Sequence, residues 1–152
     1  MYKLFILLIT FCFSAMTNAQ DTVNYRFSFN HLALSVKDVN RSAEFYSSVL
    51  HLKEIVNRTK KDGIRWFSMG EGNELHLIST TPGEVKINKA VHLALTSPRF
   101  NDFIKELKQK NVPFSDWPGE PGKINVRPDN ILQIYLQDPD GYWIEVNSVA
   151  QD

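Results

Sequence analysis

Three histidines and one glutamate occupy corresponding places in two similar halves of the sequence. His31 opens the run His-Leu-Ala-Leu, and the same four residues return at His92, sixty-one positions later. A second strand-like segment in each half adds a polar group, His76 in Glu-Leu-His-Leu-Ile and Glu145 in Trp-Ile-Glu-Val-Asn. Imidazole and carboxylate groups together bind divalent Zn, Fe, Mn, Ni or Co. The sequence therefore predicts a site for one of these metals, formed by His31, His76, His92 and Glu145.

The repeat is what favours metal binding over a simpler role for these histidines. A single strand histidine is more often hydrogen-bonded or half-exposed than a ligand, and His51, the fourth histidine, is interpreted as such a residue at a helix end. Three histidines on corresponding strands of a repeat are harder to explain in that way. Three neutral imidazoles and one carboxylate give a divalent site a net charge of about +1, which favours an anionic or enolate-like oxygen donor.

Two aromatic residues and one arginine are candidates for substrate binding. Trp66 and Tyr135 lie in predicted strands, where they can line an apolar pocket or belong to the core. Arg127 can meet an anionic substrate or remain on the solvated surface.

The elements that position these residues follow the same order in both halves: a strand, a helix and three strands. In the first half we predict strands at 29–36, 52–57, 63–69 and 74–79, with Asn40 as the N-cap of the helix. In the second half we predict strands at 90–96, 123–127, 131–137 and 142–147, with Ser97 as N-cap and Pro98 at the first helical position. The expected fold is α+β: two tandem βαβββ modules, about 28–80 and 88–149, form a curled eight-stranded mixed sheet around a cavity, with the helices outside.

Composition places the chain among globular proteins and excludes some functions. Its 152 residues are 43% hydrophobic and 22% charged, which suits one domain. Seventeen basic and seventeen acidic residues, without a basic run, argue against nucleic acid as a partner. The one cysteine, Cys12, lies in the N-terminal apolar run, so metal ligands must be nitrogen and oxygen.

The first nineteen residues are typical of a signal peptide. Lys3 precedes an apolar run over 4–13, and Ala19 offers a small residue for cleavage. The run is too short to anchor the protein in a bilayer. We therefore expect a single domain over 20–152 in a secreted or periplasmic protein that has no membrane anchor after cleavage.

Several motifs resemble the vicinal oxygen chelate superfamily, which includes glyoxalase I, extradiol dioxygenases and bleomycin resistance proteins. They are His-Leu-Ala-Leu at the start of a module, Phe45-Tyr46 in the helix, and Asp-Pro-Asp-Gly-Tyr-Trp-Ile-Glu ending at Glu145. The resemblance implies metal ligands at His31, His76, His92 and Glu145, with Glu145 also acting as a base. It implies a small-molecule substrate and a homodimer, whose sites take their ligands either from one chain or from both.

Three functions remain open within that resemblance. The first is a metal-dependent, glyoxalase-like lyase or isomerase, which acts on adjacent substrate oxygens through an enediolate-like intermediate; glyoxalase I usually has Glu at the place of His76. The second is an extradiol-type dioxygenase that uses His31, His92 and Glu145. The third is a metal-free binding protein similar to the bleomycin resistance proteins.

Overall fold

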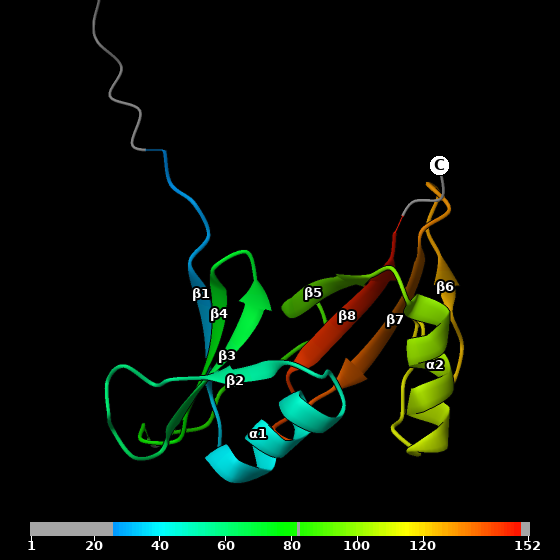
Figure 1. Cartoon of the computed structure of the whole chain (residues 1–152). Coiled ribbons are helices and arrows are strands. Elements are labelled where there is room, and N and C mark those ends of the chain that lie inside the picture. The colour runs from blue at the N-terminus through cyan, green and yellow to red at the C-terminus, as the bar shows by residue number, and fades with distance from the viewer. Residues whose placement is uncertain (1–25, 82, 150–152) are drawn as a thin grey trace, which may run out of the picture.

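The computed structural model describes residues 26–81 and 83–149, which form two modules with the same order of elements (Figure 1). The first contains β1 (His31–Ser35), α1 (Val39–Ser48), β2 (Lys53–Ile55), β3 (Ile64–Gly70) and β4 (Asn73–Ile78). The second contains β5 (His92–Ser97), α2 (Phe100–Gln109), β6 (Asn125–Val126), β7 (Leu132–Gln137) and β8 (Trp143–Ser148). The predicted βαβββ repeat is thereby confirmed; the predicted signal peptide lies outside the described residues.

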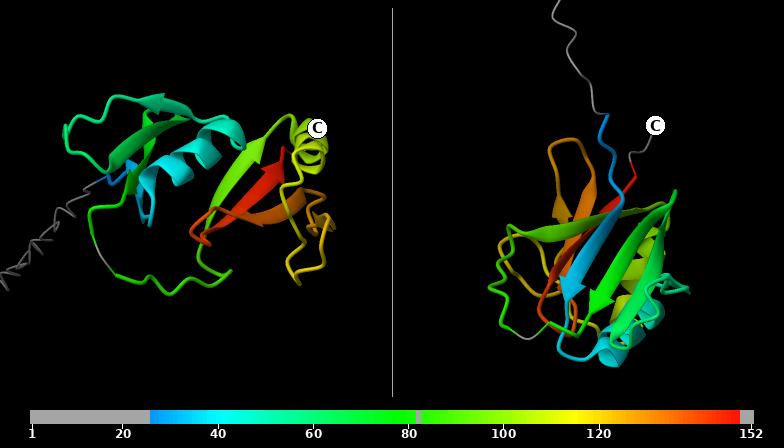
Figure 2. Two further views of the ribbon diagram at one scale, coloured as in Figure 1. Left: turned by 90° about the horizontal axis from the view of Figure 1, so that it is seen from below. Right: turned by 90° about the vertical axis from the view of Figure 1, so that its left-hand side faces the viewer.

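Each module forms its own four-stranded mixed sheet. The strand orders are β1-β4-β3-β2 and β5-β8-β7-β6, so the two halves have identical topology. The first strand of each module runs parallel to the last, and the remaining pairs are antiparallel. The α+β class is as predicted, with the eight strands divided between two open sheets (Figure 2). β1 and β5 are both end strands, which leaves one edge of each available.

Alternation along the strands separates a packed face from a polar one. In β1, Leu34 is buried while His31 and Ala33 are exposed. The largest fully buried side chains come from both modules, and α1 packs on β3 and β4 while α2 packs on β8. They include Tyr46, Phe67, Leu75, Leu77, Leu107, Ile134, Leu136 and Ile144. The histidines therefore project from faces that the module's own helix does not cover.

Both helices begin at residues other than those predicted. α1 is capped by Asp38 instead of Asn40: the Asp38 carboxylate accepts hydrogen bonds from the backbone N–H groups of Asn40 and Arg41. α2 begins at Phe100, after Arg99, and the Ser97 hydroxyl accepts a bond from the Arg99 N–H. In each case the predicted and the observed cap lie two residues apart. Sequence patterns do not locate a helix end to within two residues. Neither helix of the described residues is long and apolar enough to cross a membrane.

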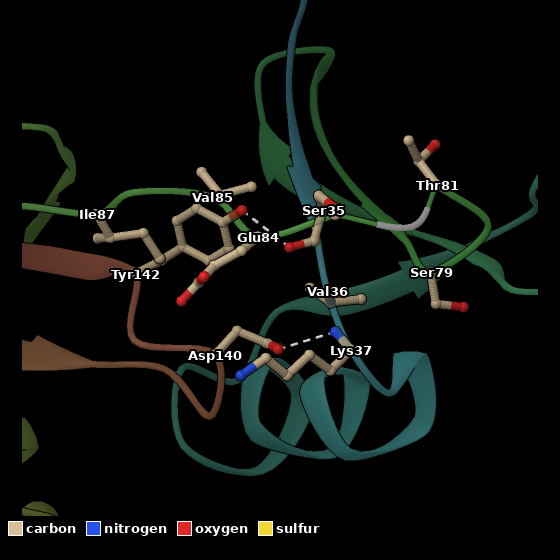
Figure 3. Close-up of a pocket in the computed structure, with 11 residues that line it drawn as sticks. Ser35, Val36, Lys37, Ser79, Thr81, Glu84, Val85, Ile87, Asp140 and Tyr142 are labelled. Atoms are coloured by element: carbon tan, nitrogen blue, oxygen red, sulfur yellow. Dashed lines mark hydrogen bonds between the residues drawn. The ribbon is translucent and has the colours of Figure 1, made fainter.

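The Asp-Pro-Asp-Gly turn between β7 and β8 joins the second module to the first. The hydroxyl of Tyr46 in α1 donates to Asp138 Oδ2 at 2.9 Å, and both side chains are buried. Asp140 accepts bonds from the Ser42 hydroxyl at 2.7 Å and from the Lys37 backbone N–H at 2.8 Å. Figure 3 shows the Lys37 bond, together with the bond from the Tyr142 hydroxyl to the Ser35 carbonyl. The turn that the sequence indicates is thus also the connection between modules.

Candidate metal centre

In the first module, the strand register brings His31 and His76 together. Ala33 lies opposite His76 on β4, and His31 lies opposite Glu74, so the two histidines are diagonal neighbours on one face of the sheet. Their rings stack with centroids 4.3 Å apart and planes 16° apart. The indole of Trp66, opposite His76 on β3, stacks on the other side of the His76 ring at 4.0 Å. The three rings form one column on the polar face.

Glu74 holds His76 in this column. Its carboxylate lies 2.8 Å from His76 Nε2 and accepts a 2.7 Å hydrogen bond from Arg58 Nη2. These bonds, first the one with His76 and then the one from Arg58, hold the pKa of Glu74 below its ordinary value. The Arg58 guanidinium lies 4.6 Å from the centre of the Trp66 ring. With Nε2 facing a carboxylate, Nδ1 is the His76 atom left to bind a metal, and a carboxylate behind a histidine is the usual arrangement for ligands.

In the second module, Glu145 is buried among donors on neighbouring strands. Its Oε1 accepts bonds from Asn147 Nδ2 at 2.6 Å and Gln133 Nε2 at 2.9 Å, and its Oε2 accepts one from the Tyr135 hydroxyl at 2.6 Å. Burial alone would raise the pKa of Glu145, but the bonds from Tyr135, Asn147 and Gln133, together with His92, hold it below its ordinary value. The carboxylate is therefore both fixed in place and ionised.

The geometry of His92 relative to Glu145 fits a shared metal ion. His92 Nε2 lies 3.1 Å from Glu145 Oε2, and His92 Nδ1 lies 2.9 Å from the Lys89 carbonyl oxygen. A carbonyl accepts hydrogen bonds only, so Nδ1 carries a proton, and Nε2 is the nitrogen that a neutral His92 would offer to a metal beside the carboxylate. Two atoms that bind one ion at about 2.0–2.2 Å are separated by roughly 3 Å. The donor set and spacing of this pair thus suit a divalent ion.

The structure does not bring the two pairs together within one chain. Among residues 26–81 and 83–149, no group of three His, Cys, Asp or Glu side chains is placed to hold one ion. His31 and His76 form one half-site, and His92 and Glu145 form another. Within one chain, the four predicted ligands therefore do not surround a single ion. They could do so only if the two half-sites came together in some other way.

The three residues predicted to bind substrate lie in different surroundings. Trp66 is in the column on β3, and Tyr135 is the buried donor to Glu145. Burial and this bond raise the pKa of Tyr135, so its hydroxyl keeps its proton. Arg127 is exposed beyond β6 and pairs with Asp129 at 2.8 Å. Its guanidinium has a partner on the surface instead of a place in either half-site.

Sequence reasoning did not assign roles to the residues that orient the candidate ligands. Glu74 and Asn147 lie two positions from His76 and Glu145, so strand periodicity put them on the right faces. Gln133 lies two positions before Tyr135, on the same face of β7. Lys89 had no such signal, because its contacts are with a loop more than twenty residues away.

Comparison with known proteins identifies the family. The model of the Glyoxalase/Bleomycin resistance protein/Dioxygenase superfamily matches residues 28–146. The chain belongs to this superfamily. The match includes both half-sites, and the resemblance noted in the sequence is confirmed.

Relatives within the superfamily have different descriptions. The chain is 29% identical over 125 residues to the uncharacterized protein YwbC of Bacillus subtilis, covering 76% of this chain and 93% of that protein. It is 28% identical over 127 residues to the metallothiol transferase FosB of Staphylococcus epidermidis, covering 80% of this chain and 81% of FosB.

Solved structures of other proteins share the fold. The oxidase ChaP-H2 has a TM-score of 0.67 at 20% identity, covering 82% of this chain and 94% of that one. Lactoylglutathione lyase from Agrobacterium tumefaciens has a TM-score of 0.63 at 18% identity, covering 82% and 96%. At these identities the likeness concerns the superfamily fold alone.

Proposed function

We propose that the protein is a metal-dependent enzyme that acts on a small substrate with adjacent oxygen atoms, as a glyoxalase-like lyase or isomerase. The observation that carries the proposal is the pair His92 Nε2 and Glu145 Oε2, 3.1 Å apart. His92 Nδ1 faces the Lys89 carbonyl, Glu145 Oε1 accepts from Gln133 and Asn147, and Oε2 accepts from the Tyr135 hydroxyl as well as facing His92. Such preorganisation is expected of metal ligands.

The complete site in this proposal forms between two copies of the chain. His31 and His76 of one copy join His92 and Glu145 of the other, around one Zn, Fe, Mn, Ni or Co ion. Two observations support this arrangement: each half-site is incomplete in its own chain, and both His31 and His92 lie on end strands with an open sheet edge. A twofold-symmetric dimer would then hold two equivalent sites.

The chemistry follows from the charge and the neighbours of the site. A bound divalent ion would act as a Lewis acid toward substrate oxygens. The ionised Glu145 carboxylate binds the cation and is unprotonated, as a base must be, so the proposal gives it both roles. Trp66 was predicted to bind substrate, but the buried indole stacks on His76 and lies under the Arg58 guanidinium, so in the proposal it holds the His76 ring in place. Tyr135, predicted to bind substrate, orients Glu145 in this proposal through its hydroxyl, and Arg127 is a peripheral contact for an anionic substrate.

Thiol transfer is a second candidate. The similarity to FosB extends over 80% of this chain, and FosB is described as a metallothiol transferase. The two activities can be separated by assaying the metal-loaded protein for two reactions. A thiol transferase consumes a thiol, whereas a glyoxalase-like enzyme isomerises 2-oxoaldehyde adducts.

Metal content and a mixing experiment test the shared site. We expect close to one ion per chain after loading and dialysis, and loss of that ion in both His31→Ala and His92→Ala. When the two variants are unfolded together and refolded, about half of the dimers are mixed, and each mixed dimer has one intact site of two. The mixture should therefore recover about a quarter of the metal-binding capacity of the wild type. No recovery, with dimers present, would contradict a site shared between chains. A wild-type protein that takes up none of the five metals would contradict the enzyme proposal and favour a metal-free binding protein.

A further inference from the structure

The ammonium group of Lys89 is fully engaged beside the second half-site. Its Nζ donates to the backbone carbonyls of Asp116 at 2.5 Å and Trp117 at 2.9 Å, and lies 3.4 Å from the Ser115 hydroxyl. An ammonium has three protons, and three acceptors surround this one. All three belong to the segment 114–122, called here the 114–122 loop.

Three aromatic rings enclose the same ammonium. Nζ lies 4.5 Å from the centre of the Tyr135 ring, 4.7 Å from that of Trp143 and 5.6 Å from that of Trp117. These distances are within the range of cation–π attraction. This aromatic cage is thus filled by a cation of the chain itself.

The loop carries Trp117 to the half-site. Trp117 is 47% exposed, and its ring is inclined edge-to-face to those of His92 and Tyr135, with centroids 6.3 Å and 5.4 Å apart. Tyr135 donates to Glu145, so Trp117 packs against one candidate ligand and against the residue that orients the other.

Other bonds keep the loop folded without Lys89. Ser115 and Tyr135 exchange two backbone hydrogen bonds, and the Gly122 N–H donates to the Phe114 carbonyl. The Asp116 side chain accepts from the N–H groups of Gly119 and Glu120. These bonds close the two ends of the loop, whereas the bonds of Lys89 hold its middle, at Ser115, Asp116 and Trp117, against the half-site.

We propose that Lys89 is a positioning residue for the second half-site. Its ammonium fastens the 114–122 loop so that Trp117 packs on His92 and Tyr135, and its carbonyl orients the His92 ring. The indole of Trp117 thereby covers one side of the half-site. The role in metal binding rests on the proposed function, whereas the fastening of the loop does not.

Lys89→Met tests this proposal, with Lys123→Met as its matched control. Methionine keeps the length and apolar stem of Lys89 and can pack among aromatic rings, so the fold is retained. Lys123 touches the same loop from outside, with Nζ 2.6 Å from Glu120 and 3.7 Å from Asp116, and contacts neither His92 nor Tyr135. Both variants are measured as full chains by hydrogen exchange of the 114–122 loop and by titration with Co²⁺, whose absorption spectrum reports ligand geometry.

In Lys89→Met we expect exchange of the loop to be about tenfold faster, because bonds to a charged donor are lost. We also expect Co²⁺ to bind about tenfold more weakly with an altered spectrum, as for other groups that orient ligands. Lys89→Arg, which keeps a cation that can stack on the rings, should recover part of both effects. Values for Lys89→Met equal to wild type, or equal to those of Lys123→Met, would overturn the proposal. If wild type itself binds no Co²⁺, the proposed function fails, and loop exchange alone decides whether Lys89 fastens the loop.

Discussion

Each candidate histidine ligand has one ring nitrogen facing an oxygen acceptor that is not itself a candidate ligand. His31 Nδ1 lies 2.7 Å from Asn30 Oδ1, His76 Nε2 faces Glu74, and His92 Nδ1 faces the Lys89 carbonyl. Three different acceptors, two side chains and one backbone group, produce the same result. In each ring the remaining nitrogen can present a lone pair, as a neutral imidazole ligand must.

At the level of single residues, His76 is the most informative position to change. We expect His76→Ala to weaken metal binding by about 10- to 100-fold, and His76→Glu to retain the ion while lowering the net charge of the site by about one unit. Affinity is measured by competition with a chelator in the metal-loaded dimer. Trp66→Phe, which keeps an aromatic ring beside His76, is the control. If His76→Ala binds as tightly as wild type while His31→Ala loses the ion, the four-ligand set is wrong.

The sequence identified the candidate ligands but not their supports. His31 and His92 stand out because the four-residue repeat places them on corresponding strands, and Glu145 follows a recognisable turn. The roles of Lys89 and Arg58 arise from contacts between segments that are distant in the sequence. Such contacts cannot be predicted from the periodicity of neighbouring residues. His51 matched its interpretation as a helix-end residue: its φ is 54°, a left-handed conformation, and its ring lies 2.8 Å from Glu106.

At the level of elements, the Asp-Pro-Asp-Gly turn stabilises α1 through a buried bond. We expect Tyr46→Phe to lower the free energy of unfolding by about 1–3 kcal/mol, because Asp138 Oδ2 then loses its buried donor. Urea unfolding measures this loss. Tyr142→Phe removes a hydroxyl from a half-buried bond to Ser35 and should cost less. Equal losses in the two variants would show that burial of the Tyr46–Asp138 bond adds nothing.

Asp138 in the same turn makes the stability of the fold depend on pH. Burial raises the pKa of Asp138 above its ordinary value of 3.8, although the bond from Tyr46 and backbone N–H groups oppose the shift. The folded state therefore binds this proton more tightly than the unfolded state, and stability from Asp138 falls as pH rises from about 4 through its folded pKa. Asp138→Asn does not titrate. We expect the stability of wild type relative to Asp138→Asn to decrease over this range and then level off, in urea unfolding at a series of pH values. A constant or increasing difference would contradict the raised pKa.

Element order and strand faces could be predicted because each depends on nearby residues. Strand bounds differed from the predicted ones mostly at the ends: β2 is three residues and β6 only two, where longer runs of suitable residues were present. A strand extends only as far as its neighbour pairs with it, and that partner lies elsewhere in the chain. The division into two sheets likewise depends on how modules pack, which no local pattern specifies.

At the level of the whole molecule, we propose that the protein is exported after removal of residues 1–19. This proposal is based on the apolar run that follows Lys3 and on the small residue Ala19 at the expected cleavage site. Mass spectrometry of the protein expressed with its leader should find a mature N-terminus at Gln20 in the secreted or periplasmic fraction. Ala19→Arg should block cleavage and serve as the control. An intact Met1 in a cytoplasmic fraction would contradict export.

The buried bond between Tyr46 and Asp138 also bears on how the chain is made. These residues are 92 positions apart, so a ribosome synthesises α1 long before it reaches the acceptor that α1 requires. Until then the nascent first module must keep the Tyr46 hydroxyl in water or bury it without a partner, at a cost in free energy. Final packing of α1 thus waits for the second module. In the export proposed above, the first module would therefore begin translocation before this bond is made.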